Sequence, residues 1–344
     1  MNPLFKQGMP GDSKDFIIFI LEQIHKELKK PSKEYKTLAE PFNEYNQKNA
    51  FDHFFYETFQ KEVSIISDIF YGFQENTNDC LNCKNSYSLK GMINPLCYNY
   101  GIFNCLVFPL EEVKNMVNNN MQNNMNNSMN NMQNMNNMNN MQNMNNMNNS
   151  MNNMQYMNNM NNSMNNIQSM NNMQNNGYFN NSYNNGNNYI QVNQNNRVTL
   201  YDCFQYSQKT DHFTGDNQNY CKICKMLSDT DFTSKIYSCP KVLILILNRG
   251  KGNEFDVKLD FSEAIDIGKF VSLKDNPEIN YDLYGVITHL GESGPNAHFV
   301  AACKSQIHNQ WYRFNDAFVN PIKDIKKEIM DFGFPYILFY QKRQ

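Results

Sequence analysis

Four of the nine cysteines stand in two pairs with the same spacing, Cys80-Leu-Asn-Cys83 and Cys221-Lys-Ile-Cys224. Two such pairs supply four thiolates, which is the ligand set of a closed tetrahedral structural zinc site. The long separation of the pairs is no obstacle, because each doubling of a flexible loop costs only about 0.6 kcal/mol in closure entropy. We therefore expect one structural zinc ion here; four unrelated thiols or a redox pair are the alternatives.

A second set of polar residues suits acid–base chemistry. His298 begins one predicted strand, and Asn315, followed by Asp316, ends the next. An amide or carboxylate at that place can orient and polarise the imidazole of the histidine. Taken alone the pattern is weak evidence, because a histidine beside apolar residues is more commonly a structural residue with its hydrogen bonds satisfied.

The elements that would hold these residues divide into a helical front and a β-rich back. Residues 12–30 carry apolar side chains at helical spacing, with Asp12 as a candidate N-cap and Pro31 as a stop signal. Residues 65–80 have a strand-like pattern. The strands predicted on the C-terminal side are residues 242–247, 281–288, 298–303, 311–314 and 335–340. This order favours an α+β fold with a mostly antiparallel sheet.

Between the two cysteine pairs lies a segment of unusual composition. Residues 115–196 contain no Lys, Arg, Asp or Glu and hold 17 of the 22 methionines, mostly in Met-Asn-Asn triplets. A three-residue period matches neither helix nor strand burial, and the segment buries too little apolar surface to offset its chain entropy. We expect a low-complexity, disordered insert with some tendency to self-associate.

Charge and hydropathy exclude several classes of function. The net charge of −3 and the isoelectric point near 6.1 offer no basic surface for a phosphate backbone, which argues against nucleic acid as a partner. The longest apolar run, residues 242–247, is too short to span a bilayer, and the first residues lack the apolar stretch of a secretory signal. We expect an intracellular protein, in the cytoplasm, the nucleus or both, without a membrane partner.

Several blocks then occur in a recognisable order. Gly11-Asp-Ser-Lys-Asp-Phe16 precedes the helix that ends in Ile24-His-Lys-Glu-Leu28, and the two cysteine pairs, residues 239–249, residues 289–300 and residues 335–340 follow. Together these blocks resemble the ubiquitin-specific proteases, a papain-like family of deubiquitinating enzymes. In that family the corresponding blocks are the Gln-Gln-Asp segment, the Leu-His-x-Glu-Leu helix, the zinc-bearing fingers, a Pro-Leu-Arg segment, the His box and the closing strand.

The resemblance implies a fold and a chemistry. The fold is the α+β ubiquitin-specific protease fold, with a palm, zinc-ribbon fingers built on Cys80, Cys83, Cys221 and Cys224, and here an incomplete thumb. The reaction is thiol-dependent hydrolysis of the bond that follows the C-terminus of ubiquitin, so ubiquitin and ubiquitinated proteins are the partners. His298 is the general base, Asn315 orients its ring, and Asp316 supports the site.

The nucleophile of that family is missing from this sequence. No string resembles the Cys box, Gly-Asn-Thr-Cys-Tyr-x-Asn-Ser. Cys303 follows His298 on the same predicted strand, but an odd offset points the two side chains to opposite faces, so we expect Cys303 in the core. Cys97, Cys105 and Cys239 are expected to be small buried thiols, whereas Cys203 fits either role. Without a thiolate beside His298 the chain alone is expected to be inactive.

Two main hypotheses follow. In the first, the chain is the C-terminal part of an active deubiquitinase, cut short by a truncated gene model, and its nucleophile lies upstream. In the alternative it is a catalytically dead pseudo-deubiquitinase that binds ubiquitin as a scaffold. A zinc-ribbon module for nucleic acid is a third, opposed by the charge. The expected organisation is a thumb remnant and first half of the fingers in residues 1–114, the insert in residues 115–196, and the second half of the fingers with the palm in residues 197–344.

Overall fold

The computed structural model describes residues 11–34, 36–92, 95–124, 126, 197–249, 256–273, 279–290, 298–331 and 334–343. The chain divides into two compact units, one made of Met1–Val117 and Asn195–Gln344, the other of Asn118–Gln194. All described strands lie in the first unit, which mixes helices and sheets as the α+β prediction required. No helix within the described residues is long and apolar enough to cross a membrane.

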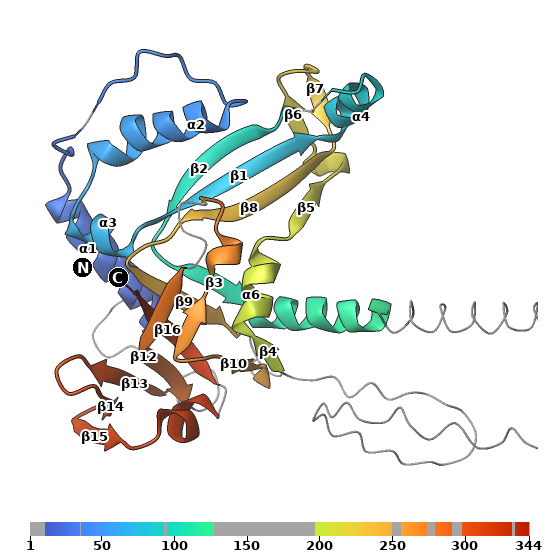
Figure 1. Cartoon of the computed structure of the whole chain (residues 1–344). Coiled ribbons are helices and arrows are strands. Elements are labelled where there is room, and N and C mark those ends of the chain that lie inside the picture. The colour runs from blue at the N-terminus through green and yellow to red at the C-terminus, as the bar shows by residue number, and fades with distance from the viewer. Residues whose placement is uncertain are drawn as a thin grey trace, which may run out of the picture. The chain divides into compact units, whose positions relative to one another are not determined.

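The first unit holds an elongated four-stranded antiparallel sheet. Its strand order is β2-β1-β8-β5, with bounds Cys97–Phe103, Gly72–Cys80, Thr230–Ser238 and Thr210–Phe213. The ladder between β1 and β8 runs from Phe73 opposite Ser238 to Cys80 opposite Thr230, so residues from both sides of the insert share one sheet. Figure 1 shows the end of β1 running into helix α4 (Leu81–Leu89), beside the hairpin of β6 (Asn219–Cys221) and β7 (Met226–Ser228).

Aromatic side chains hold a short helix against this sheet. Helix α2 (Gln47–His53) carries Phe51, whose ring lies 5.2 Å from that of Tyr100 and 6.0 Å from that of Phe73. The next turns are helical as well, as η1 (Phe54–Thr58) and η2 (Phe59–Lys61). The carboxylate of Glu75 is buried and accepts hydrogen bonds from the Tyr100 hydroxyl (2.7 Å) and the Gln47 amide (2.8 Å). These two hydrogen bonds offset the free-energy cost of burying a negative charge.

The second sheet of this unit has eight strands. Seven follow the order β15-β14-β13-β12-β16-β9-β3, and β11 pairs with β12. Their bounds are Phe318–Ile322, Gln310–Asn315, His298–Ser305, Asn280–Leu290, Pro335–Lys342, Val242–Asn248 and Leu106–Pro109, with Ala264–Asp266 for β11. Every described pairing in it is antiparallel except that of β3 with β9. The predicted C-terminal strands are therefore confirmed.

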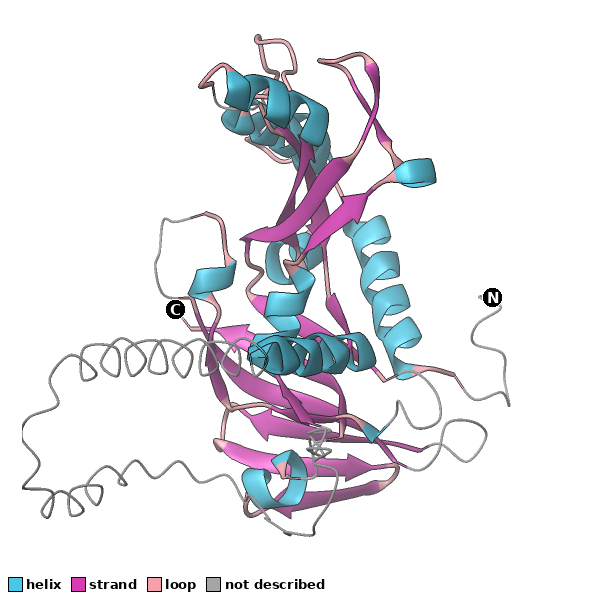
Figure 2. Cartoon of the chain, turned by 90° about the vertical axis from the view of Figure 1, so that its right-hand side faces the viewer, coloured by secondary structure: helices cyan, strands magenta, loops and turns pink. Residues whose placement is uncertain are grey.

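Both faces of this sheet are covered near β9. Ile244 and Ile246 pack into a core shared with helix α1 (Ser13–Leu28), while the alternate residues Leu243, Leu245 and Leu247 belong to a second, larger core with helix α6 (Leu200–Ser207). Side chains of a strand point alternately to opposite faces, so an unbroken apolar run indicates burial on both. Figure 2 shows α1 and the helices that flank the strands.

The structure corrects two local predictions. Residues 65–70 form helix α3 (Ile65–Phe70) rather than the start of a strand, because Ser64 and Ser67 form a capping box that satisfies the first backbone amides. Residues 110–124 are helical, so the first ten residues of the predicted disordered insert are not disordered. Leu110 and Val113 are fully buried and hold the start of that helix in the core. The following residues extend it, because adding a residue to a formed helix costs less than starting one. The rest of the insert lies outside the described residues, apart from residue 126.

The remaining short elements complete the first unit. Strands β4 (Arg197–Thr199) and β10 (Lys258–Asp260) pair in parallel. Three further helical turns, η3, η5 and η6, span Gly215–Asn217, Gly268–Phe270 and Lys326–Met330. Asp12 caps α1 by accepting a hydrogen bond from the backbone amide of Lys14 (2.9 Å), as predicted.

Candidate functional site

Adjacent strands bring the candidate acid–base residues together. His298 is the first residue of β13 and Asn315 the last of β14, and the two strands are antiparallel, with Ala301 opposite Phe314. Nε2 of His298 lies 2.6 Å from Oδ1 of Asn315. An amide oxygen only accepts hydrogen bonds, so Nε2 carries the proton and Nδ1 presents its lone pair. The arrangement leaves Nδ1 as the nitrogen that can take up a proton.

Asp316 lies next to this pair. Its Oδ2 is 4.0 Å from Nε2 of His298, too far for a hydrogen bond, and its side chain is 80 % exposed. Its φ of 50° places it in the left-handed region, which is unusual for a residue with a side chain. The turn from β14 to β15 thus places a carboxylate beside the imidazole.

A mostly apolar cavity of about 500 Å³ opens beside Asn315. Its apolar walls come from β12, β13 and the segment before β16, and its charged groups are Asp256, Arg313 and Glu328. Arg313 and Glu328 pair across 3.7 Å. Apolar walls with a few polar groups are typical of ligand-binding pockets.

Helix α1 is tied to the strands that carry this site. The Tyr336 hydroxyl donates to Oδ2 of Asp12 over 2.7 Å, and the ring of Tyr336 lies 5.5 Å from that of Phe299, the neighbour of His298. His289, on β12, contacts Phe299 at 4.9 Å between ring centroids. Local sequence patterns contain no sign of this link, because Asp12 and Tyr336 are 324 residues apart.

The cysteines do not complete an acid–base–nucleophile set. All nine are among the described residues, and within those residues no thiol is hydrogen-bonded to His298. Cys303 is exposed, so its predicted place in the core is wrong; its partner in the ladder with β12, Gly285, has no side chain to cover the thiol. It lies five positions after His298, about 16 Å along the strand. Cys203 is fully buried, whereas Cys97, Cys105 and Cys239 are only partly so.

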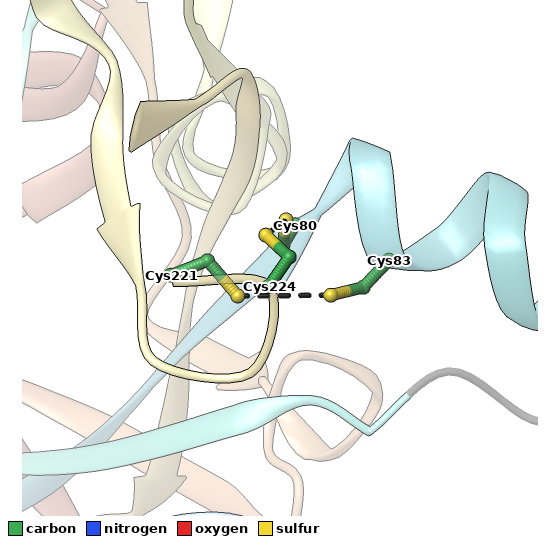
Figure 3. Close-up of side chains that lie close together, drawn as sticks. All are labelled: Cys80, Cys83, Cys221 and Cys224. Carbon is green, nitrogen blue, oxygen red and sulfur yellow. Dashed lines mark hydrogen bonds between the residues drawn. The ribbon is translucent and has the colours of Figure 1, made fainter. Parts of the chain in front are cut away.

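The four paired cysteines do come together. Cys80 ends β1, Cys83 lies in the first turn of α4, and Cys221 and Cys224 stand at the β6–β7 turn (Figure 3). Their sulfurs all lie within 4.8 Å of one another, with 3.8 Å between Cys80 and Cys224 and 3.7 Å between Cys83 and Cys221. A tetrahedral ion with Zn–S bonds of about 2.3 Å requires sulfurs about 3.8 Å apart, so the group could hold zinc.

Local groups prepare these thiols for a cation. Hydrogen bonds from the Ser228 hydroxyl and the Asn82 amide lower the pKa of Cys224 to about 6. Burial raises the pKa of Cys83, and its thiol neighbours add to this effect. Thiols crowded in this way deprotonate together only when a cation compensates their charge.

A fifth cysteine stands next to this group. Cys97 lines a cavity of about 300 Å³ together with Cys80, Cys83 and Cys221. The sequence placed Cys97 only at the edge of an apolar strand and offered no signal that it lies beside the two Cys-x-x-Cys pairs.

Comparison with known proteins identifies relatives of this chain. Residues 1–340 match the family model described as "Ubiquitin carboxyl-terminal hydrolase". The mouse proteins "Ubiquitin carboxyl-terminal hydrolase 17-like protein B" and "17-like protein A" are 30 % identical over 145 residues and 29 % over 154, which cover 41 % and 44 % of this chain. These alignments span only 30 % and 28 % of the two mouse proteins.

Solved structures share the fold. A structure of the yeast SAGA deubiquitinating module with a mutant Sgf73 matches with a TM-score of 0.52 at 19 % identity, covering 97 % of this chain and 51 % of that one. A SAGA module bound to monoubiquitin matches with a TM-score of 0.52 at 17 % identity, covering 97 % and 49 %. The chain therefore spans about half the length of these structural relatives and less than a third of the curated ones.

Proposed function

The chain belongs to the ubiquitin carboxyl-terminal hydrolase family as a ubiquitin-specific protease domain, and we propose that it supplies the palm, the fingers and the general base of a thiol-dependent deubiquitinase. The hydrogen bond of 2.6 Å between His298 and Asn315, set within this fold, carries the proposal. It is the contact that orients an imidazole for proton transfer in Cys-His-Asn hydrolases.

The proposed reaction begins at a cysteine that this sequence does not contain. Nδ1 of His298 takes the thiol proton, and the thiolate attacks the carbonyl carbon at the C-terminus of ubiquitin. His298 then returns the proton to the leaving amine, and a water molecule, activated by the same nitrogen, releases ubiquitin from the acyl-enzyme. Asn315 keeps the ring in the required tautomer, and Asp316 stabilises the imidazolium as it forms.

We further propose that the four-cysteine group binds one structural zinc ion. The sulfur separations support this, as does the position of the group, which ties the end of β1 to the β6–β7 hairpin. Zinc would fix the tip of the four-stranded sheet, which then forms the fingers that grip ubiquitin. A site of four cysteines requires reduced thiols, which agrees with a place in the cytoplasm or nucleus.

Ubiquitin and ubiquitinated proteins are the proposed partners. Among the structural relatives, one SAGA module is bound to monoubiquitin and another, with a TM-score of 0.50 at 16 % identity, to ubiquitin aldehyde. The cavity of about 500 Å³ beside Asn315 suits the extended tail of such a partner.

One observation favours a second function, ubiquitin binding without hydrolysis. Within the described residues no thiol contacts His298, so the chain on its own holds a base without a nucleophile. The scaffold hypothesis therefore stands beside the enzymatic one, and both require the same ubiquitin-binding surface.

Two measurements test the proposal. Titration calorimetry of the purified chain with ubiquitin is expected to show binding under either function, and absence of binding would contradict both. The 5′ end of the native transcript then separates them. An in-frame Gly-Asn-Thr-Cys-type segment upstream supports the hydrolase, and a native start at Met1 supports the scaffold.

A further inference from the structure

Arg249 is the one buried lysine or arginine among the described residues. It directly follows the last residue of β9, and only 2 % of it is exposed. An arginine keeps its positive charge at neutral pH, and taking that charge out of water is costly unless polar partners surround it. An apolar side chain of similar size would fill the same space without this cost, so stability alone does not explain a guanidinium here.

The guanidinium joins two segments that are far apart in the chain. Its Nε donates to the backbone carbonyl of Pro335 over 2.8 Å, and its Nη1 donates to the carbonyl of Val257. Val257 directly precedes β10, and Pro335 is the first residue of β16. The donors of a guanidinium lie in one rigid plane, so the two hydrogen bonds fix the two carbonyls relative to each other.

Both segments form walls of the cavity of about 500 Å³. Asp256 and Phe334 line this cavity, and they are the chain neighbours of Val257 and Pro335. The ring centroid of Phe334 also lies 5.5 Å from Cζ of Arg249, within the range of a cation–π contact. Arg249 therefore contacts the ring of one wall residue and the backbone beside both.

Another arginine contacts the cavity directly. Arg313 and Glu328 pair across 3.7 Å, and Nη2 of Arg313 donates to the Glu328 carbonyl over 3.3 Å. Both of these residues line the cavity, whereas Arg249 is not among its lining residues. Arg249 can thus act on a molecule in the cavity only through the residues that it positions.

We propose that Arg249 is a positioning residue for the C-terminal tail of ubiquitin, because it sets the places of Asp256 and Phe334 and with them the shape of the cavity. This inference rests on the proposed function, in which ubiquitin is the partner and the cavity suits its tail. Lysine cannot take over this role, since a single ammonium does not present two donors in a fixed plane to the two carbonyls. Without both hydrogen bonds the walls lose their fixed places and hold the tail less tightly.

The test compares ubiquitin with ubiquitin that lacks its C-terminal tail. Titration calorimetry measures the dissociation constants of both forms for the full chain and for Arg249→Lys, at a temperature well below the melting temperature of each protein. Burial of about 60 Å² of apolar tail surface gives about a tenfold gain in affinity, so the wild type should prefer full-length ubiquitin by at least that factor. In Arg249→Lys the ratio of the two affinities should fall close to one, while the affinity for tail-less ubiquitin stays unchanged.

A second variant separates positioning from a general loss of stability. Ile236→Val removes one methyl group from the larger apolar core, at a residue that does not line the cavity. It is expected to lower the melting temperature and to keep the preference of the wild type for full-length ubiquitin.

Two results with Arg249→Lys would overturn the inference: an undiminished preference for full-length ubiquitin, or an equal loss of affinity for both forms. If that variant does not fold, Phe334→Ala decides, because loss of the positioned ring should remove the same preference, and a preserved preference would overturn the inference. The wild type is read separately. A wild-type chain that binds neither form contradicts the proposed function, whereas one that binds both equally well contradicts only this inference.

Discussion

Replacing Asn315 by alanine tests how His298 is oriented. In the folded protein Oδ1 of Asn315 accepts the Nε2 proton over 2.6 Å. Asn315→Ala removes that acceptor without introducing a charge. Asn320→Ala is the matched control, because it removes an exposed amide from the neighbouring strand β15.

The expected size of the effect follows from the contact. A hydrogen bond between neutral groups contributes about 1 kcal/mol net, which corresponds to about a fivefold shift in the ratio of the two imidazole tautomers. We therefore expect the Nε2–H tautomer to predominate in the wild type and in Asn320→Ala. In Asn315→Ala the ratio of the Nε2–H to the Nδ1–H tautomer should fall about fivefold. In an enzyme completed by its nucleophile, loss of correct proton transfer is expected to lower the rate by about 10²–10⁴-fold.

Nitrogen chemical shifts of the imidazole report the tautomer directly. The assay uses ¹⁵N-histidine labelling near pH 8, with His298→Gln to assign the signals. A wild-type spectrum dominated by the Nδ1–H form would show that Asn315 does not set the tautomer, and so would an unchanged ratio in Asn315→Ala. The control variant separates loss of this one acceptor from a general effect of removing an amide nearby.

Three further predictions concern the metal, the insert and pH. The purified chain should hold one zinc ion by elemental analysis, and Cys83→Ser should lose it and lower the melting temperature; a folded chain without zinc would contradict the site. Deleting residues 118–190 should leave zinc content and melting unchanged, because both apolar cores lie in the other unit, and loss of either would show that the insert is needed. Burial lowers the pKa of His25 and of His289, so both bind protons more readily when unfolded, and the unfolding free energy should fall as the pH drops below about 6.5. Urea titrations at several pH values should show this slope, and the double variant His25→Phe, His289→Phe should flatten it.

Local sequence signals predicted much of the fold. The helix that begins after Asp12 follows from its cap and its apolar spacing, and the unbroken apolar run of residues 242–247 is typical of a strand buried on both faces. The meeting of the two Cys-x-x-Cys pairs was predicted from residue type and spacing, although the insert lies between them. The pairing of His298 with Asn315 was expected from the resemblance to the ubiquitin-specific proteases, because the two residues alone were weak evidence.

The errors have physical causes that a local pattern does not contain. Residues 65–70 are rich in β-branched isoleucine, yet the capping box of Ser64 and Ser67 stabilises a helix there. Cys303 was expected in the core, but burial depends on which half of a sheet other elements cover. The places of Glu75 and Cys97 depend on contacts between segments far apart in sequence, which spacing alone does not reveal.

Hydrolysis of ubiquitin that carries a fluorogenic amide at its C-terminus is the direct test of the proposed role of His298 as general base. The enzyme is the protein produced from the complete native transcript, compared with its His298→Ala variant and with the Asn320→Ala control. We expect the enzyme to hydrolyse this substrate and thiol alkylation to abolish the activity. His298→Ala should lower the rate at least about 10²-fold, and Asn320→Ala should leave it unchanged. Hydrolysis at the same rate in His298→Ala would contradict the proposed role of His298.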